Sequence, residues 1–226
     1  MGCAAESGQV TGLRQYPMNV NLEGRECIVL GGGHVALRKV RSLLETGAAV
    51  TVIAPTLAEA LQEMAGEGRV DWRAETYAPG RLPKGFLLIC ATDDEAVNRA
   101  AAAEAKEQGM LVNAPAQPEL SDFTVPASLR RGSLLLTVST EQLSPACARL
   151  IRRYLEQEFP ESFGKWLEDL ARLREEVKCT LPDSAARERF WRQVMDEDLL
   201  KLAMAGDLEQ AEVRIRNAVD RNRVEL

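Results

Sequence analysis

The sequence predicts an α/β fold, in which a parallel sheet with helices on both faces is followed by a short hairpin segment and a helical tail. Three observations predict it. Apolar strand-like runs alternate with helix-like segments over residues 27–113, the order typical of βαβ units. Two further strand-like runs, 123–129 and 134–139, flank a turn that contains glycine. From residue 145 onward the pattern is mostly helical.

Each element of the first half has a local sequence signal. The run 86–91 (FLLICA) is apolar throughout and predicts a central strand that is buried on both faces. The other predicted strands cover 27–30, 49–54, 70–75 and 111–113. Helices are predicted over 35–46, 57–65 and 94–108.

The second half begins with the hairpin, whose turn is predicted over 130–133. Ser144 followed by Pro145 is typical of a helix start, with serine as N-cap and proline in the first turn, and this helix should end near residue 158. Later helices are predicted over 163–177, 183–195, 196–205 and 207–219.

Composition excludes several classes of function. The 226 residues suffice for one large domain or two small ones, and the net charge of −6 argues against nucleic-acid binding through a general basic surface. The five cysteines lack metal-ligand spacing, and with one histidine, His34, no poly-histidine metal site is expected. Without a secretion signal or a long apolar run we expect a cytoplasmic protein with no membrane span, whose residues 1–15 form a flexible arm.

A glycine-rich turn follows the first predicted strand. Gly31, Gly33 and Ala36 fit the G-x-G-x-x-A pattern of dinucleotide-binding proteins. The first glycine permits a tight turn, the second lets a pyrophosphate approach the backbone, and the alanine lets the helix pack closely on the strand. His34 and Val35 occupy the first helical turn, whose free N–H groups would face the phosphates. The alternative is a strand-to-helix turn that binds no ligand.

Short segments after two other predicted strands would lie at the same edge of the sheet as the glycine-rich turn. Ala54, Pro55 and Thr56 follow the second strand without the acid that often binds the adenosine ribose, so backbone groups or the Thr56 hydroxyl must hold it. Local chemistry therefore does not decide whether the cofactor is NAD or NADP. Thr92 and Asp93 follow the fourth strand and either border the cofactor or cap the next helix.

Arginines gather in the second half of the chain. They either bind a polyanionic substrate through charge-assisted pairs or lie on a solvated helix face. His34 has no identifiable catalytic partner, so a bystander role is favoured for its ring. The arginines are Arg130, Arg131, Arg149, Arg152 and Arg153.

Taken together, these residues resemble the family of precorrin-2 dehydrogenases and sirohydrochlorin ferrochelatases of the siroheme synthase N-terminal type. The resemblance covers roughly residues 16–219. The pieces GGGHVALRK and ATDD, in this order, are its most specific part. The matching segments are 16–17, 21–25, 31–39, 51–55, 91–94, 112–113, 118–123, 125–127, 144–145 and 148–149.

The resemblance implies a homodimer that oxidises precorrin-2, a tetrapyrrole with many carboxylates, to sirohydrochlorin with NAD as cofactor. Some members also insert Fe²⁺ to give siroheme. It implies a Rossmann-type NAD-binding domain over 16–122, a small α+β dimerisation segment over 123–159 and an all-helical C-terminal domain over 160–226. It adds Asn113 to the expected cofactor contacts, and it favours the arginine cluster, Thr140 and Ser144 as substrate contacts.

One departure from the family pattern bears on activity. The family carries an aspartate three residues after the asparagine of the fifth strand, where this chain has Ala116. Alanine accepts no proton and attracts no metal ion, so we expect weak or absent ferrochelatase activity. Losing one acid–base group typically costs about 10²–10⁴-fold, so dehydrogenation can survive if another group takes the proton. Asp122 is a weak candidate for that group, and Glu119 is also near in sequence.

Three functional hypotheses remain from the sequence. The leading one is an NAD-dependent precorrin-2 dehydrogenase. The second is a non-catalytic or impaired protein that binds a tetrapyrrole or NAD, which Ala116 keeps open. The third, a generic NAD(P) oxidoreductase, explains the glycine turn but neither the basic segment nor the helical tail.

Overall fold

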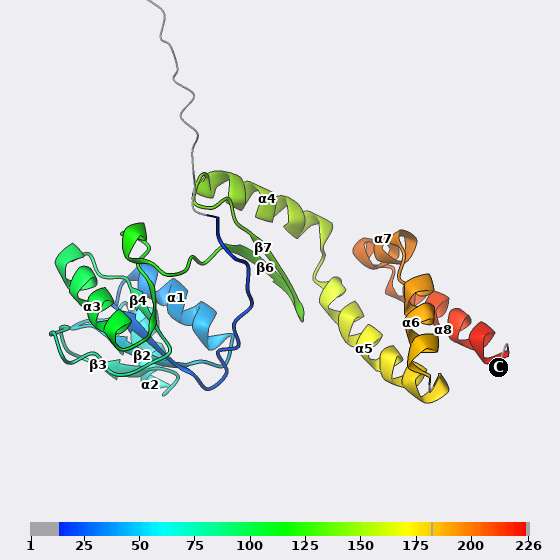
Figure 1. Ribbon diagram of the computed structural model, residues 1–226, viewed down its shortest axis with the longest axis horizontal. Helices are drawn as coiled ribbons and strands as arrows, with labels where there is room; N and C mark the ends of the chain where they lie inside the picture. The colour runs from blue at the N-terminus through cyan, green and yellow to red at the C-terminus, as the bar shows by residue number, and fades with distance from the viewer. Residues whose placement is uncertain (1–13, 182, 225–226) are drawn as a thin grey trace, which may run out of the picture. The chain divides into compact units, whose positions relative to one another are not determined.

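The protein divides into two compact units (Figure 1). The structure, a computed structural model, describes residues 14–181 and 183–224. The sheet unit spans Tyr16–Val125, and the helical unit comprises the described residues from Pro126 onward together with Arg14 and Gln15. Most of the predicted flexible arm, residues 1–13, lies outside the described residues.

The sheet unit is the predicted parallel α/β fold. Its five strands follow the order β3-β2-β1-β4-β5, and every neighbouring pair is parallel. The strands are β1 (Glu26–Leu30), β2 (Ala49–Ile53), β3 (Asp71–Arg73), β4 (Leu87–Cys90) and β5 (Leu111–Asn113). The helices are α1 (His34–Leu44), α2 (Glu59–Gly66) and α3 (Glu95–Glu107), with the short 3₁₀ turn η1 (Pro118–Leu120) after β5.

Helices cover both faces of this sheet. Alternate residues of β1 point to opposite sides, and each side has its own apolar core. Cys27 and Val29 pack in the core that includes buried residues of α1 and α2. Ile28 and Leu30 pack in the core that includes α3. The strands therefore read as continuous apolar runs, as the segment FLLICA indicates.

The direction of strand order reverses at β1. The chain moves outward from β1 through β2 to β3, and then returns to the other side of β1 to form β4 and β5. Two backbone hydrogen bonds join the strand ends there, from Ala91 N–H to Leu30 O (2.7 Å) and from Gly31 N–H to Ile53 O (2.9 Å). In open parallel sheets the crevice at the carboxyl ends beside such a reversal is where ligands bind.

The helical unit starts with an antiparallel hairpin of β6 (Ala127–Arg131) and β7 (Leu134–Val138). Its helices are α4 (Pro145–Glu158), α5 (Ser162–Thr180), α6 (Ser184–Val194), α7 (Glu197–Ala205) and α8 (Leu208–Val224). Buried side chains from α5 to α8, among them Trp166, Phe190, Leu199 and Ile215, form one apolar core. Ser144 caps α4 and Pro145 lies in its first turn, as predicted.

The first hairpin strand begins later than the predicted start at residue 123. Pro126 has no N–H to donate to a strand partner, so the ladder begins at Ala127. The strand also extends to Arg131, which leaves only Gly132 and Ser133 between the two strands where the sequence pattern predicts a turn over 130–133.

A close backbone contact joins α5 to this hairpin. A Cβ atom added at Gly164 would lie 2.8 Å from the carbonyl carbon of Arg131 and 2.8 Å from Gly132 N. Such distances are shorter than carbon contacts allow, so the helix approaches the hairpin turn only because residue 164 has no side chain.

We therefore expect Gly164→Ala to destabilise the helical unit by about 1–3 kcal/mol through forced displacement of the hairpin turn. The measurement is urea unfolding followed by tryptophan fluorescence, since Trp166 and Trp191 lie in this unit.

Gly66→Ala is the matched control, because Gly66 ends α2 and an added Cβ there meets nothing within 4 Å. It should leave stability unchanged or raise it by about 0.5 kcal/mol. Equal midpoints for Gly164→Ala and the unsubstituted protein would contradict the steric argument.

Candidate functional site

The turn between β1 and α1 is built around two glycines that no other residue can replace. Gly31 has φ +115°, and a Cβ there would lie 2.4 Å from Ala91 O. A Cβ at Gly32 would lie 2.0 Å from Thr56 O. The predicted motif assigned a role to Gly31 but none to Gly32, whose only sequence signal is its place in the glycine triplet.

The third glycine opens the start of α1 to a ligand. A Cβ at Gly33 would meet nothing within 4 Å, so this position faces open space. Gly33 is the N-cap residue, has no side chain to cap the helix, and no acidic residue follows in the first turn. His34 and Val35 are exposed there, whereas Ala36 is buried against the sheet as the motif predicts. The first N–H groups of a helix lack intrahelical partners, so this end suits an anion.

The corresponding end of α3 is already occupied by its own side chain. Asp94 Oδ1 accepts hydrogen bonds from Ala96 N–H (2.9 Å) and Val97 N–H (3.1 Å). The predicted cap, Thr92 or Asp93, is thus wrong by one or two residues. The helix after β1, and not the helix after β4, offers its first turn to a phosphate.

Thr92 holds the β4–α3 turn in place. Its hydroxyl donates to Oδ1 of the buried Asn98 (2.7 Å), and Asn98 Nδ2 donates back to Thr92 O (2.9 Å). This reciprocal pair explains why Thr92 does not cap α3. Asp93 lies next to it, exposed to solvent.

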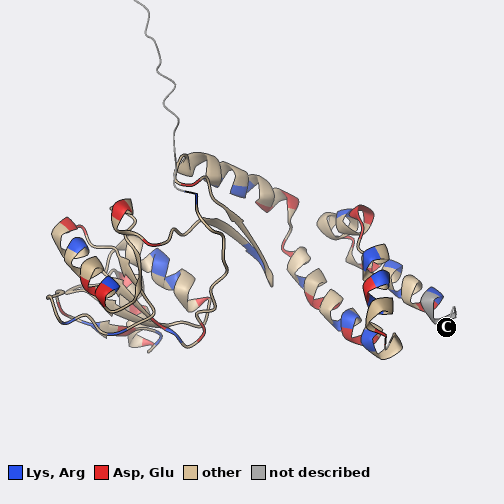
Figure 2. Cartoon of the chain, in the orientation of Figure 1, with Lys and Arg blue, Asp and Glu red and all other residues tan. Residues whose placement is uncertain are grey.

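Charge on α1 favours an anion as well. The helix contains Arg38, Lys39 and Arg41 and no acidic residue, and Figure 2 shows these basic positions in blue. Burial lowers the pKa of Lys39 to about 8, with a smaller effect from Arg38 in the same direction. The two arginines therefore carry the charge of this helix at alkaline pH.

At the end of β2, only Thr56 offers a side-chain polar group. Ala54 N–H donates to Arg73 O (3.2 Å), and Ala54 O accepts from Trp72 Nε1 (3.0 Å). Pro55 has no N–H. The exposed Thr56 hydroxyl is thus the group of this trio best suited to an adenosine ribose.

Buried amides lie at the end of β5. Asn113 Nδ2 donates to Phe123 O (2.9 Å), while Asn113 Oδ1 has no hydrogen-bond partner. Gln117 follows in a turn closed by its N–H on Ala114 O (3.1 Å), and neither polar atom of its buried side chain is paired. Ala116, in the same turn, is exposed. The residue at the position of the family aspartate thus faces solvent at the carboxyl end of β5.

Asp122 anchors β5. Its N–H donates to Val112 O (2.8 Å), and its Oδ2 accepts from Val112 N–H (3.0 Å). Its other carboxylate oxygen lies 3.1 Å from Lys106 Nζ. These contacts give Asp122 a structural role. Glu119 forms an ion pair with Arg99 on the surface.

The predicted substrate arginines divide into two groups. Arg131 is buried, and its guanidinium donates to Phe159 O (2.7 Å) and Glu156 O (3.3 Å) and pairs with Glu161. It therefore binds the C-terminal end of α4 instead of facing a ligand. Arg130 and Arg149 are exposed.

The two predicted hydroxyl contacts shape the turn before α4. Ser144 Oγ accepts from Cys147 N–H (3.2 Å), and Thr140 Oγ1 accepts from Ser144 N–H (3.2 Å). Between them, Glu141 (φ 49°) and Gln142 (φ 68°) adopt the left-handed conformation. Glycine adopts this conformation most readily, and here two successive residues with side chains hold it.

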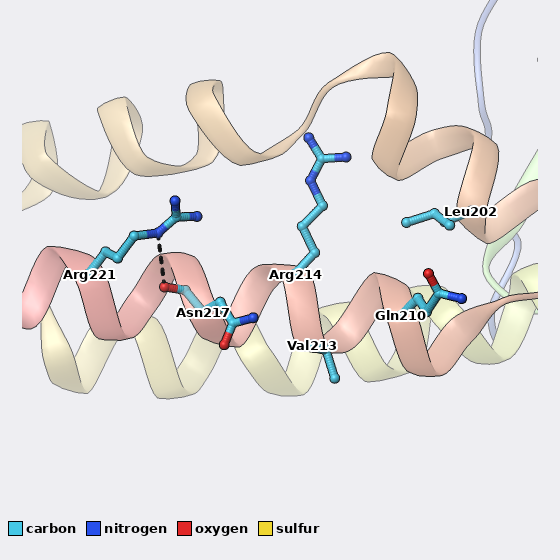
Figure 3. Close-up of a pocket in the computed structure, with 6 residues that line it drawn as sticks. All are labelled: Leu202, Gln210, Val213, Arg214, Asn217 and Arg221. Atoms are coloured by element: carbon cyan, nitrogen blue, oxygen red, sulfur yellow. Dashed lines mark hydrogen bonds between the residues drawn. The ribbon is translucent and has the colours of Figure 1, made fainter.

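A cavity of about 290 Å³ lies in the helical unit, between α7 and α8 (Figure 3). Its Arg214 forms an ion pair with Asp196, and Arg221 Nε donates to Asn217 O (3.3 Å). The predicted site residues do not line it. The lining residues are Leu202, Gln210, Val213, Arg214, Asn217 and Arg221.

The described residues lack both a membrane-spanning helix and a cluster of metal ligands. Within residues 14–181 and 183–224, no helix combines the length and the apolar character that crossing a membrane requires. Over the same ranges, no group of three or more His, Cys, Asp or Glu side chains is arranged to hold a metal ion.

Comparison with known proteins identifies relatives over most of the chain. Residues 18–127 match a family model described as "Putative NAD(P)-binding", and residues 162–219 match one described as "Sirohaem synthase dimerisation region". The siroheme synthase of Nitrosococcus oceani is 35% identical over 92% of this chain and 44% of its own length. That of Chromobacterium violaceum is 37% identical over 90% of this chain and 43% of its own length.

The chain thus spans less than half the length of these curated relatives. A solved structure, "SirC, precorrin-2 dehydrogenase", matches 88% of this chain and 99% of its own, with a TM-score of 0.72 and 27% identity. The sequence matches and the fold match both agree with the motifs around the glycine turn. The chain belongs to the family of precorrin-2 dehydrogenases and sirohydrochlorin ferrochelatases of the siroheme synthase type.

Proposed function

We propose that this chain is an NAD-dependent dehydrogenase that converts precorrin-2 to sirohydrochlorin in siroheme biosynthesis. The observation that carries the proposal is the open start of α1, where Gly33 faces free space and no side chain caps the helix. The structural likeness to SirC, a precorrin-2 dehydrogenase, supports the substrate.

The residues at the sheet edge suit a dinucleotide. The N–H groups of the first turn, at His34 and Val35, would bind the pyrophosphate, and Thr56 would bind the adenosine ribose. Asn113 lies at the end of β5, on the other side of β1, where the nicotinamide would lie. The cofactor supplies the hydride chemistry, so the task of these residues is to hold and orient it.

The substrate class follows from charge. Precorrin-2 carries many carboxylates, which arginine guanidinium groups bind well. The exposed Arg130 and Arg149 are suited to this task, whereas Arg131 is committed to α4. Thr140 and Ser144 would act through the shape of their turn.

Ferrochelation, in which Fe²⁺ is a second substrate of a lyase reaction, should be weak. Ala116 supplies no carboxylate to take pyrrole protons or to guide the metal ion. The same residue favours the second candidate function, an impaired protein that binds NAD or the tetrapyrrole without efficient turnover.

We also propose a homodimer in the cytoplasm, with no nucleic-acid partner and no membrane partner. Apolar side chains recur along one stripe of α4 and the turn before it, and the exposed ones are Leu143, Leu150, Ile151 and Tyr154. Only Ala148 of α4 is buried. An exposed apolar stripe of this kind is typical of a protein interface.

Two parts of the second half of the chain are candidates for the dimer interface. The stripe lies within residues 123–159, the predicted dimerisation segment between the NAD-binding domain (16–122) and the helical C-terminal domain (160–226). The matched dimerisation-region model instead covers α5 to α8. A test of the dimer must therefore probe both parts.

Gly33→Ala should weaken NAD⁺ binding by about tenfold or more while leaving the fold intact. The added methyl meets no protein atom, but it fills the space through which the pyrophosphate approaches. Isothermal titration gives the Kd, and thermal unfolding checks the fold. Gly66→Ala, which also adds a methyl in open space, is the control and should bind NAD⁺ normally. Unchanged NAD⁺ affinity in Gly33→Ala would refute this placement.

Ala116→Asp should raise siroheme formation from precorrin-2, NAD⁺ and Fe²⁺ by about 10²-fold or more, because it restores the acid–base group. Absorbance spectra follow sirohydrochlorin and siroheme separately. Ala116→Asn is the control, since it has nearly the same shape without an ionisable group.

If the unsubstituted protein already forms siroheme as fast as a bifunctional relative, the argument from Ala116 fails. If it binds NAD⁺ and precorrin-2 without oxidation until Ala116→Asp is introduced, the second candidate function is correct.

Leu150→Glu should convert the dimer to a monomer, because it places a charge in an apolar interface. Sedimentation at several protein concentrations measures the change. Val213→Glu, at an exposed position of α8, is the comparison. Dissociation by Val213→Glu alone would move the interface to α5–α8, and a monomeric unsubstituted protein would exclude the homodimer.

A further inference from the structure

Two buried amides at the carboxyl end of β5 lack hydrogen-bond partners that their burial demands. Asn113 is 5% exposed and Gln117 is 4% exposed. Asn113 Nδ2 is satisfied by Phe123 O, which leaves Asn113 Oδ1, Gln117 Oε1 and Gln117 Nε2 without partners. An unpaired buried polar group is unfavourable, and native proteins rarely leave such groups without a partner.

The missing partner has a definite hydrogen-bonding pattern. Two carbonyl oxygens require two donors, and one NH₂ group requires an acceptor. Exchanging the oxygen and nitrogen positions of the Gln117 amide leaves this requirement unchanged. A primary carboxamide offers this set, because its NH₂ group has two N–H donors and its oxygen accepts.

We propose that Gln117, together with Asn113 Oδ1, binds the carboxamide of the cofactor's nicotinamide ring. The inference rests on the proposed function only in taking NAD as the cofactor. With the pyrophosphate at α1 and the adenosine beside β2, the nicotinamide extends toward β4 and β5, where these amides lie. Gln117 is then a cofactor-positioning residue that the glycine motif does not reveal.

The turn that carries Gln117 is fixed at its start by a hydrogen bond, and its middle residues are exposed to solvent. Ser121 Oγ lies 2.9 Å from Ala114 N and 3.4 Å from Ala114 O, and so fixes the start of the turn. Pro115 and Ala116, between Ala114 and Gln117, are exposed. The amide itself is enclosed, so binding requires rotation of the Gln117 side chain, which has three rotatable bonds.

Nucleotide analogues test this assignment without any turnover. The 3-acetylpyridine analogue of NAD⁺ carries a methyl group in place of the carboxamide NH₂ and so lacks both donors. Isothermal titration should show that the unsubstituted protein binds NAD⁺ about tenfold or more tightly than the analogue, since a site with unpaired acceptors discriminates against a ligand without donors.

Gln117→Met should reduce this preference to about twofold. Methionine has a similar volume and no polar atoms, so it removes the unpaired amide without creating a cavity. Gln108→Met is the matched control, because Gln108 is an exposed glutamine at the end of α3, and it should keep the full preference.

Any other outcome would overturn the assignment of Gln117 to the nicotinamide carboxamide. Equal binding of both nucleotides by the unsubstituted protein, or an undiminished preference in Gln117→Met, would mean that an internal water satisfies the two amides. In those cases NAD⁺ still binds and the proposed function stands. Failure of the unsubstituted protein to bind NAD⁺ at all would instead refute the proposed function together with this inference.

Discussion

The close approach of the β1–α1 turn to two neighbouring backbone segments is the constraint on which the sheet edge depends. The carbonyl oxygen of Ala91 lies 2.4 Å from the position of a Cβ on Gly31, and that of Thr56 lies 2.0 Å from the position of a Cβ on Gly32. The turn therefore packs directly against the backbone that follows β2 and β4, because Gly31 and Gly32 have no side chains. Of the two helices that follow β1 and β4, α3 begins with an acidic cap and α1 does not.

The chemistry available at this edge is mainly that of neutral groups. Backbone N–H groups, the Thr56 hydroxyl and the amides of Asn113 and Gln117 can bind and orient a cofactor. The carboxylate that the family has beside them is absent, and the nearby Asp122 is engaged with Val112 and Lys106. The arrangement suits hydride transfer, which depends on orientation, better than metal insertion, which depends on proton removal.

Much of this fold follows from local sequence signals. Strand β5 and helix α4 have the predicted ends, because turn residues and the Ser144–Pro145 pair mark them. Long-range contacts account for what the sequence did not predict. The backbone of Ala54 looks available in sequence, yet the register of β3 brings Trp72 and Arg73 onto it. Arg131 looks like its exposed neighbour Arg130, but only the packing of α4 shows that it is buried.

The position of Arg131 has a consequence for how the helical unit opens. One side chain of β6 joins the last carbonyl groups of α4 to Glu161 at the start of α5. The hairpin, the end of α4 and the first turn of α5 therefore share a single set of hydrogen bonds, and none can loosen without exposing a buried guanidinium. Their amide protons should exchange with solvent as one cooperative group, separately from those of α8.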